Sequence, residues 1–357
     1  MKEFVKIIDF KKLSCAFAVI LLAVLLCTSI FSFKSNMITP QPLAKNVSAD
    51  NITEERIDIE KFKNSKIKLT LTLKRKSIKL KFTSVKNSSC YEIFRKQKNE
   101  KNFTLIGTTQ KNQFSDKTVK SGKTYIYKVR AVLKQKEGQI NGKCSNKIKK
   151  KYVKFDENKK MVALTFDDGP GKYTKSILKC LDKNDAHATF FVLGNSVNNY
   201  KPSIKKADLI GCEIGSHSFD HSNLSILSSK GIKSQMNRTD KRLKKIIDHG
   251  ASLMRPPYGA INSSVKKSVK KPVITWNIDT RDWETRSALS TYKSVIKNAR
   301  DGDIILMHDI HGSTKTAALK IIPELKKRGY QLVTVSELAE YKGVKLKNGE
   351  VYNKIKQ

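Results

Sequence analysis

The chain has 357 residues, enough for two domains with flanking segments. It carries 71 Lys and Arg against 32 Asp and Glu, a formal net charge of +39. This charge excludes no fold, but it favours polyanionic surroundings such as nucleic acid, an anionic envelope polymer or a lipid surface. The N-terminal segment helps to choose among these partners.

Residues 13–33 contain no charged side chain and are long enough to cross a bilayer as a helix, which takes about 20 residues. Lysines precede this segment and favour a cytoplasmic N-terminus. The sequence therefore predicts a transmembrane signal-anchor over 1–33, with the following domains outside the cell membrane. A secreted protein, released by signal-peptide cleavage, is the alternative. Both versions export the chain from residue 34, which argues against nucleic acid as a partner.

Residues 34–63 mix Pro, Asn, Ser and charge, which is typical of a linker. From 64 to 153, apolar and polar residues alternate in short runs, for example in 66–73 and 124–132, with Gly, Asn, Asp and Ser between them. About seven short strands in such a length predict an antiparallel all-β sandwich. Residues 91–132 resemble a bacterial fibronectin type III module, which carries no catalytic motif.

The predicted sandwich is strongly basic. Residues 61–150 contain 26 basic and 4 acidic side chains, a net charge of +22. A solvated lysine-rich surface accounts for this composition. Adhesion to an anionic wall polymer is the alternative, and such adhesion should weaken as salt is added.

The cysteines of the exported part are isolated: they are Cys90, Cys144, Cys180 and Cys212. None forms a C-x-x-C pair, so neither a thiolate zinc site nor a redox motif is predicted. Export would permit disulfides, but the spacing selects no pairs, and small buried thiols are the simpler interpretation.

From 160 to 342, short apolar runs alternate with longer amphipathic stretches. The predicted strands are 161–166, 188–193, 213–215, 273–277, 304–307 and 332–335. The predicted helices are 174–181, 228–247, 289–299 and 316–327. This alternation predicts an α/β fold with a parallel sheet, open or closed into a barrel, in which the chemistry lies at the carboxyl ends of the strands. Residues 343–357 are predicted to form a basic C-terminal tail.

Polar clusters follow these predicted strands. Their chemistry-bearing residues are Asp167 and Asp168, His217 and His221, Arg255, Asp279 and Asp282, and His308. Each cluster alone has a plain structural explanation, such as an acidic turn, a surface histidine pair, a rigid loop or a buried histidine. Their occurrence in order, each at a strand end, predicts one catalytic site. The other histidines, His187, His249 and His311, have no partner pattern and are predicted to be structural or solvated, with His311 left open because it is near the site.

Two adjacent carboxylates need a cation beside them, and Asp167 and Asp168 form such a pair. His217 and His221, four residues apart, can present two imidazoles to the same cation. One carboxylate and two imidazoles form a facial set that suits zinc, with Co²⁺, Ni²⁺, Fe²⁺ or Mn²⁺ as alternatives, and leaves positions open for water and substrate. The other carboxylate can then take a proton from water.

The clusters resemble the five motifs of polysaccharide deacetylases with a NodB homology domain (carbohydrate esterase family 4). The matching stretches are Thr165-Phe166-Asp167-Asp168-Gly169-Pro170, His217-Ser218-x-x-His221, Arg255-Pro256-Pro257-Tyr258-Gly259, Asp279-x-x-Asp282-Trp283 and Leu306-x-His308. The resemblance covers roughly 160–342, and no motif residue is missing. It implies a distorted (β/α) barrel.

The resemblance also implies residue roles. Asp168, His217 and His221 correspond to the metal ligands. Asp167 corresponds to the general base that activates the attacking water, and Arg255 to the residue that pairs with this base and orients it.

The remaining roles concern the substrate and the leaving group. The backbone N–H of Tyr258 would stabilise the oxyanion, and Tyr258 would also contact the substrate. His308 corresponds to the general acid that protonates the departing amine, and Asp279 would hold and charge it. Trp283 and Leu306 correspond to walls of the acetate pocket.

The expected activity is a metal-dependent hydrolysis of N-acetyl groups on a cell-envelope polysaccharide. Predicted export, the basic sandwich and Tyr258 favour peptidoglycan N-acetylglucosamine as the substrate. A chitin or exopolysaccharide deacetylase and an acetylxylan esterase remain alternatives within the enzyme class. The alternative from another class is a wall-binding protein with a vestigial catalytic domain.

Overall fold

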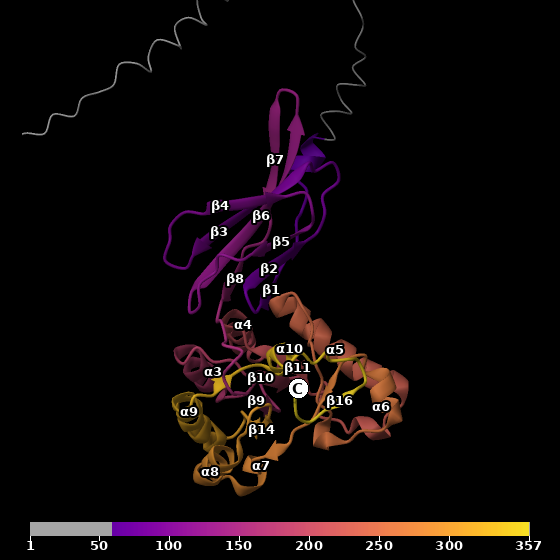
Figure 1. Cartoon of the computed structure of the whole chain (residues 1–357). Coiled ribbons are helices and arrows are strands. Elements are labelled where there is room, and N and C mark those ends of the chain that lie inside the picture. Colours follow the sequence, from indigo (N-terminus) through magenta and orange to yellow (C-terminus); the bar gives the residue numbers. More distant parts are fainter. Residues whose placement is uncertain (1–58, 357) are drawn as a thin grey trace, which may run out of the picture. The chain divides into compact units, whose positions relative to one another are not determined.

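A computed structural model describes residues 59–356 of the chain (Figure 1). The predicted transmembrane segment, 13–33, and nearly all of the predicted linker lie outside these residues. Within 59–356, none of the helices combines the length and apolar character that crossing a membrane requires. The described residues form a β-rich part followed by an α/β part.

The β-rich part consists of two antiparallel sheets. Its strands are β1 (Leu69–Lys74), β2 (Ser77–Phe82), β3 (Cys90–Gln97), β4 (Thr104–Thr109), β5 (Gln113–Asp116), β6 (Thr124–Gln135), β7 (Gly138–Cys144) and β8 (Ile148–Lys151). One sheet has the order β1-β2-β5; the other has the order β4-β3-β6-β7, with β8 also paired to β6. Alternate residues face one shared core, among them Ile78, Leu80, Ile93, Tyr127 and Val129, as the period-two pattern predicts.

The strands of the α/β part run parallel where they pair with one another. They are β9 (Met161–Asp167), β10 (Thr189–Val192), β11 (Glu213–Ser216), β12 (Val273–Ile274), β13 (Ile278–Asp279), β14 (Ile304–His308), β15 (Gln331–Leu332) and β16 (Val351–Tyr352). The helices are α3 (Thr174–Lys183), α4 (Lys201–Ile210), α5 (Ser229–Ile247), α6 (Ser263–Ser268), α7 (Asp282–Thr285), α8 (Ala288–Asn298), α9 (Gly312–Lys327) and α10 (Val335–Tyr341), with short 3₁₀ turns η2 (Leu224–Ile226) and η3 (Pro257–Gly259).

The parallel strands close into an irregular ring. The main path has the order β11-β10-β9-β14-β13, and isolated bridges lead from Ser216 to Met254 and from Met254 to Val273 of β12. These bridges connect β12 to the β11 end of the path, and β13 pairs with β14 at the other end. Only a few residues separate β12 from β13, so the two ends of the path meet there. This arrangement is the predicted distorted barrel, and all residues of its central strand β9 are buried.

Strand register brings the polar clusters to one edge of this barrel. His308, the last residue of β14, pairs with Asp167, the last residue of β9. Ser216, the last residue of β11, pairs with Val192 of β10, so His217 follows at the same edge. Parallel strands end on the same side, which is why segments far apart in the sequence meet there.

The predicted strand 332–335 is correct only at its beginning. β15 ends at Leu332, and α10 begins at Val335. Thr334 caps this helix: its hydroxyl accepts the Glu337 N–H while the Glu337 side chain accepts the Thr334 N–H. This capping box starts a helix where the apolar run 332–335 favours a strand.

The prediction of a basic tail over 343–357 is wrong. β16 pairs with β12, and Lys354 bridges to Asp303. Ile355 is buried in the core formed by β12, β14 and α10. Lysine-rich composition suggested a basic tail, but apolar residues spaced between the lysines hold the segment against the barrel.

The four cysteines of the described residues are free thiols. Cys212 is fully buried, and burial raises the pKa of its thiol to about 12. Burial also raises the pKa of Cys180 above its ordinary value. Both thiols are therefore protonated at neutral pH, which fits the simple structural interpretation of these residues.

Candidate active site

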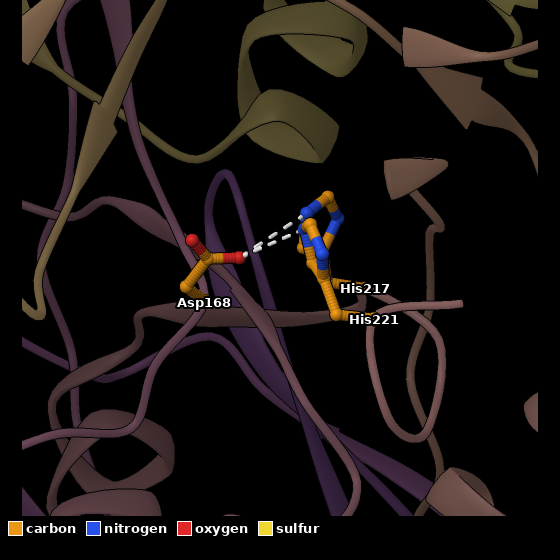
Figure 2. Close-up of side chains that lie close together, drawn as sticks. All are labelled: Asp168, His217 and His221. Atoms are coloured by element: carbon orange, nitrogen blue, oxygen red, sulfur yellow. Dashed lines mark ion pairs between the residues drawn. The ribbon is translucent and has the colours of Figure 1, made fainter. Parts of the chain in front are cut away.

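Three predicted metal ligands converge at the barrel edge. Asp168, His217 and His221 each offer one ligand atom, and these atoms lie within 4.8 Å of one another. Asp168 Oδ1 is 3.5 Å from His217 Nε2 and 3.3 Å from His221 Nε2. Figure 2 shows both imidazole rings turned toward this carboxylate.

The outer nitrogens of both rings are held by other groups. His217 Nδ1 lies 2.8 Å from the carbonyl oxygen of Arg255. A carbonyl only accepts, so His217 donates from Nδ1 and keeps a lone pair on Nε2. His221 Nδ1 lies 3.1 Å from the Tyr258 hydroxyl, whose ring packs edge-on against the imidazole at 4.7 Å.

This arrangement fits a divalent cation. Asp168 Oδ1 is buried and has no hydrogen-bond donor among the described residues. Burial lowers the pKa of His217, so its ring is neutral and directs a lone pair toward the carboxylate. Lone pairs that face each other in a buried site repel unless a cation lies between them, and one carboxylate with two imidazoles is a ligand set of catalytic zinc sites.

Several of these residues adopt backbone angles that side chains ordinarily avoid. The φ angle is positive at Asp168 (68°), Ser218 (70°), His221 (65°) and Tyr258 (61°). For residues with a side chain, this region costs about 1–2 kcal/mol. Such angles turn the chain sharply after β9, after β11 and before α6, where the candidate ligands and Tyr258 lie.

The predicted base and its partner form a buried ion pair. Arg255 is fully buried, and its Nη1 donates to Asp167 Oδ1 at 2.7 Å and to the Thr165 hydroxyl at 2.7 Å. Nη2 donates to the Thr275 carbonyl, and the guanidinium stacks on the Phe191 ring at 4.2 Å. These contacts satisfy a charge that burial would otherwise disfavour and fix the orientation of Asp167.

Asp282, not Asp279, holds His308. Asp282 Oδ1 is 2.9 Å from His308 Nδ1, and Oδ2 accepts the His308 backbone N–H at 2.8 Å. The predicted role of Asp279 is therefore wrong: its carboxylate accepts the Arg281 N–H and faces the cavity. Asp282 begins α7, and this helical start turns its side chain back toward β14, which the shared motif Asp-x-x-Asp does not reveal.

The neighbours of His308 favour its charged form. Burial alone would lower the pKa of His308, but the Asp282 hydrogen bond and the negative charges of Asp167 and Asp168 outweigh it and raise the pKa. Burial likewise opposes ionisation of Asp282, yet its hydrogen bonds with His308 and Thr314 lower its pKa. The pair thus keeps a proton on His308 to a higher pH than free imidazole would.

A cavity of about 420 Å³ joins these groups. The predicted site residues among its walls are Asp167, Asp168, His217, His221, Tyr258, Asp279, Trp283, Leu306 and His308. Tyr258 and Trp283 lie at the open side and are 70% and 47% exposed as whole residues, whereas Leu306 is buried. Arg255 acts from behind Asp167 and does not line the cavity.

Two residues of the site were not predicted. Trp276 also lines the cavity, and its ring packs next to Gly259.

The second residue, Asp309, is fully buried behind the site and accepts a hydrogen bond from the Thr174 hydroxyl. Burial raises the pKa of Asp309 to about 7. A side chain at position 169 would collide with the Asp309 carboxyl, so Gly169 is required beside it. Only the position of Asp309 directly after His308 offered a sequence signal.

His311 lies near this site without lining it. Arg286 contacts its Nδ1, and its ring centroid is 6.1 Å from that of His308. Burial and the Arg286 charge lower the pKa of His311. This histidine is therefore a neutral neighbour of His308.

A family model described as polysaccharide deacetylase matches residues 154–275. The chain is 43% identical over 188 residues to the peptidoglycan-N-acetylmuramic acid deacetylase PdaC of Bacillus subtilis, covering 52% of this chain and 40% of that protein. It is 39% identical over 202 residues to a peptidoglycan-N-acetylglucosamine deacetylase of Bacillus cereus, covering 54% of this chain and 94% of that protein.

Solved structures agree with these relatives. The T48 deacetylase, solved with substrate, is 38% identical with a TM-score of 0.54, covering 56% of this chain and all of that one. A family 4 acetyl xylan esterase from Clostridium thermocellum, solved with a cobalt ion, is 34% identical with a TM-score of 0.53, covering 55% of this chain and 99% of that one.

The chain therefore belongs to the polysaccharide deacetylase family, as the motifs predict. It spans only about two fifths of the length of PdaC and of the Listeria monocytogenes deacetylase PgdA, which it also matches. The shared region is the α/β part that carries the site.

Proposed function

We propose that the chain is a metal-dependent deacetylase that hydrolyses N-acetyl groups of a cell-envelope polysaccharide, with peptidoglycan N-acetylglucosamine as its substrate. The observation that carries the proposal is the convergence of three metal donors, the Arg255-bound Asp167 and the Asp282-bound His308 around one cavity. Relatives named as peptidoglycan deacetylases support the choice of polymer.

Asp168, His217 and His221 would hold the ion, which we assign as zinc; Co²⁺, Ni²⁺, Fe²⁺ and Mn²⁺ suit the same donors. When bound, the ion supplies positive charge that polarises the acetyl carbonyl and acidifies the attacking water.

Asp167 acts as the general base. Arg255 occupies its Oδ1, so Oδ2, which is 3.8 Å from His217 Nε2, is the atom left to take the proton as water attacks the acetyl carbon. The backbone N–H of Tyr258, at the cavity wall, would donate to the oxygen that becomes negative in this step.

His308 acts as the general acid. It lies opposite Asp167 in the β9–β14 register, so base and acid approach the amide from different strands. As the carbon–nitrogen bond breaks, His308 gives its proton to the departing nitrogen, leaving acetate and a free sugar amine. Asp282 positions the imidazole and stabilises its charged form. Trp283 and Leu306 would enclose the acetyl methyl group.

Acetate release from defined glycans tests this proposal. The purified chain, loaded with Zn²⁺ or Co²⁺, is offered peptidoglycan, N-acetylglucosamine oligomers, chitin and acetylxylan. We expect release from peptidoglycan and the oligomers, loss with chelator, and a fall of at least about a hundredfold in Asp167→Asn. Asp220→Asn is the matched control, because Asp220 is bonded to Gln235 and Ser222 and not to the site. Release that persists in Asp167→Asn would refute the mechanism.

The same assay separates the alternatives. Preference for acetylxylan would favour an esterase, the activity named for one structural neighbour. Preference for chitin would favour a deacetylase of another polymer. Wall binding without release from any glycan would favour a non-catalytic binding protein.

We also propose that residues 13–33 anchor the chain in the cell membrane with residues 34–357 outside, or are cleaved to release it. Supporting this are their length and the preceding lysines. Mass spectrometry of the mature N-terminus distinguishes the two versions.

We assign the β sandwich as a fibronectin type III-like module that adheres to an anionic wall polymer. Its two-sheet architecture and its net charge of +22 over residues 61–150 support this role. Its adhesion should weaken with salt, since exposed charges are screened over about 10 Å at 0.1 M ionic strength.

A further inference from the structure

One face of the β sandwich groups lysines around aromatic rings. In the β3–β6 register Phe94 lies opposite Lys128, and Lys96 lies two residues further along β3, on the same side of the sheet. The residues next to them in the two strands, Ile93, Tyr127 and Val129, are buried in the core. The side chains of Phe94, Lys96 and Lys128 therefore point outward. We call Phe94, Lys96, Phe103, Lys128 and Lys147 the lysine–phenylalanine face.

Three ammonium groups of this face converge on one ring. The Nζ atoms of Lys96, Lys128 and Lys147 lie 5.5, 4.7 and 5.8 Å from the centroid of Phe103. Lys128 Nζ is also 5.1 Å from the Phe94 centroid, and the Arg130 guanidinium lies 5.2 Å from that centroid. The three lysines come from β3, β6 and the residue before β8, so the sheet itself brings them together.

These three ammonium groups have no carboxylate within ion-pair distance among residues 59–356. Lys96 Nζ donates to the carbonyl oxygens of Glu100 and Lys101. The nearby carboxylates are engaged elsewhere: Glu92 binds Arg130, and Glu100 accepts from the Gln97 N–H. A ring face contributes only about 0.5–1 kcal/mol per exposed cation, so the grouped charges remain available to an anion.

The geometry also indicates which kind of polymer fits. The rings of Phe94 and Phe103 already have cations over them, so they do not offer free surfaces on which neutral sugars could stack. Lysine ammonium groups are compact point charges that bind phosphate oxygens without a fixed orientation. A sheet surface with several such charges suits a flexible chain that carries one negative charge per repeat.

We infer that the lysine–phenylalanine face binds a linear phosphodiester polymer of the cell envelope through Lys96, Lys128 and Lys147. The inference rests on the proposed wall adhesion of the sandwich and assigns it to one face and one ligand chemistry. It is independent of the deacetylase site, because none of these residues lines the catalytic cavity.

Inorganic polyphosphate is the probe. Its dissociation constant is measured at several NaCl concentrations for the full chain, for Lys96→Gln/Lys128→Gln/Lys147→Gln, and for Lys68→Gln/Lys79→Gln/Lys81→Gln. The second triple variant is the matched control. It removes the same charge from β2 of the other sheet, at Lys79 and Lys81, and from Lys68, the residue before β1. Among the described residues no aromatic ring gathers these lysines.

We expect the first triple variant to bind polyphosphate about tenfold more weakly at low salt, with a shallower salt dependence, and the control to change less than about twofold. Equal weakening of both variants would overturn the inference, because net charge alone would then explain binding. Absence of polyphosphate binding by the wild-type chain, or binding only to vesicles of anionic lipid, would overturn it as well.

Acetate release is measured on the same preparations, so that a failure of the polyphosphate inference can be told apart from a failure of the deacetylase proposal. Retained release in both triple variants shows that the α/β part is intact, and an unchanged circular dichroism spectrum shows that the sandwich is folded, so a loss of binding is specific. If the triple variant does not fold, Lys147→Gln replaces it, since this exposed lysine precedes β8; we then expect about a two- to fivefold loss. Release without any polyphosphate binding refutes the face and leaves the deacetylase proposal standing.

Discussion

In the α/β part, the Arg255 guanidinium is fully buried and bonded to Asp167, whereas the ammonium groups of Lys128 and Lys147 on the β sandwich have no carboxylate partner among the described residues. A buried charge is costly unless it is paired, so the site is a network in which each residue fixes the next. The sandwich charges remain near water, where pairing is worth little and where they act together on an external polyanion. Removing one charge should therefore reduce the activity of the α/β part strongly and weaken polyanion binding by the β sandwich only slightly.

The largest effect is expected at the metal donors. Asp168→Ala leaves two imidazoles without their carboxylate, so the affinity for Zn²⁺ should fall by more than about a hundredfold. Calorimetric titration and metal content of the purified chain measure this loss. Asp220→Asn, one residue before His221 but bonded to Gln235, should keep the metal. Full metal content in Asp168→Ala would show that the carboxylate is not a ligand.

A smaller effect, on pH dependence, is expected at His308. Its raised pKa extends the pH range in which the acid is protonated, so activity should be lost as pH rises through that pKa. Asp282→Asn removes the main stabilising hydrogen bond, so the alkaline limb of the rate profile should move to lower pH and the rate should fall about a hundredfold. Asp279→Asn is the matched change and should leave that limb in place. The reverse pattern would restore the role first predicted for Asp279.

Tyr258 should have an intermediate influence on the metal. Its hydroxyl lies 3.1 Å from His221 Nδ1, and partners of this kind orient metal-binding imidazoles. Tyr258→Phe keeps the ring and removes the hydrogen bond, so Co²⁺ affinity should fall about tenfold in calorimetry. Tyr292→Phe, a phenol packed against the α/β core away from the cavity, is the control. Unchanged affinity would restrict Tyr258 to contact with substrate.

The smallest effect is expected from salt on catalysis. Raising NaCl from about 0.05 M to about 0.5 M shortens the screening length several-fold, yet the buried Arg255–Asp167 and Asp282–His308 pairs are largely shielded from ions. Deacetylation of a short neutral oligomer should change less than about twofold, whereas polyphosphate binding by the sandwich should fall steeply. A parallel loss of both would remove the distinction between the two regions.

The sequence predicted the regular elements where one periodicity dominates. The helix predicted over 228–247 is α5, and the strand predicted over 161–166 is β9. The sequence analysis missed α4, which begins after a loop and has mixed polarity. It also extended the predicted strand 332–335 into α10, because the apolar run conceals the local capping-box signal. The C-terminal segment was misjudged because lysine content masked the burial of Ile355.

Motif order alone predicted the family, the set of candidate metal donors, and a candidate base and acid at strand ends. The sequence could not determine which carboxylate holds His308, because Asp279 and Asp282 share one motif and only the start of α7 directs Asp282 toward β14. Nor could it reveal Trp276 and Asp309 as neighbours of the site, or the left-handed backbone at Asp168, His221 and Tyr258. Those features depend on contacts between distant segments: a strained angle or a buried charge persists only where the packed surroundings compensate for its cost.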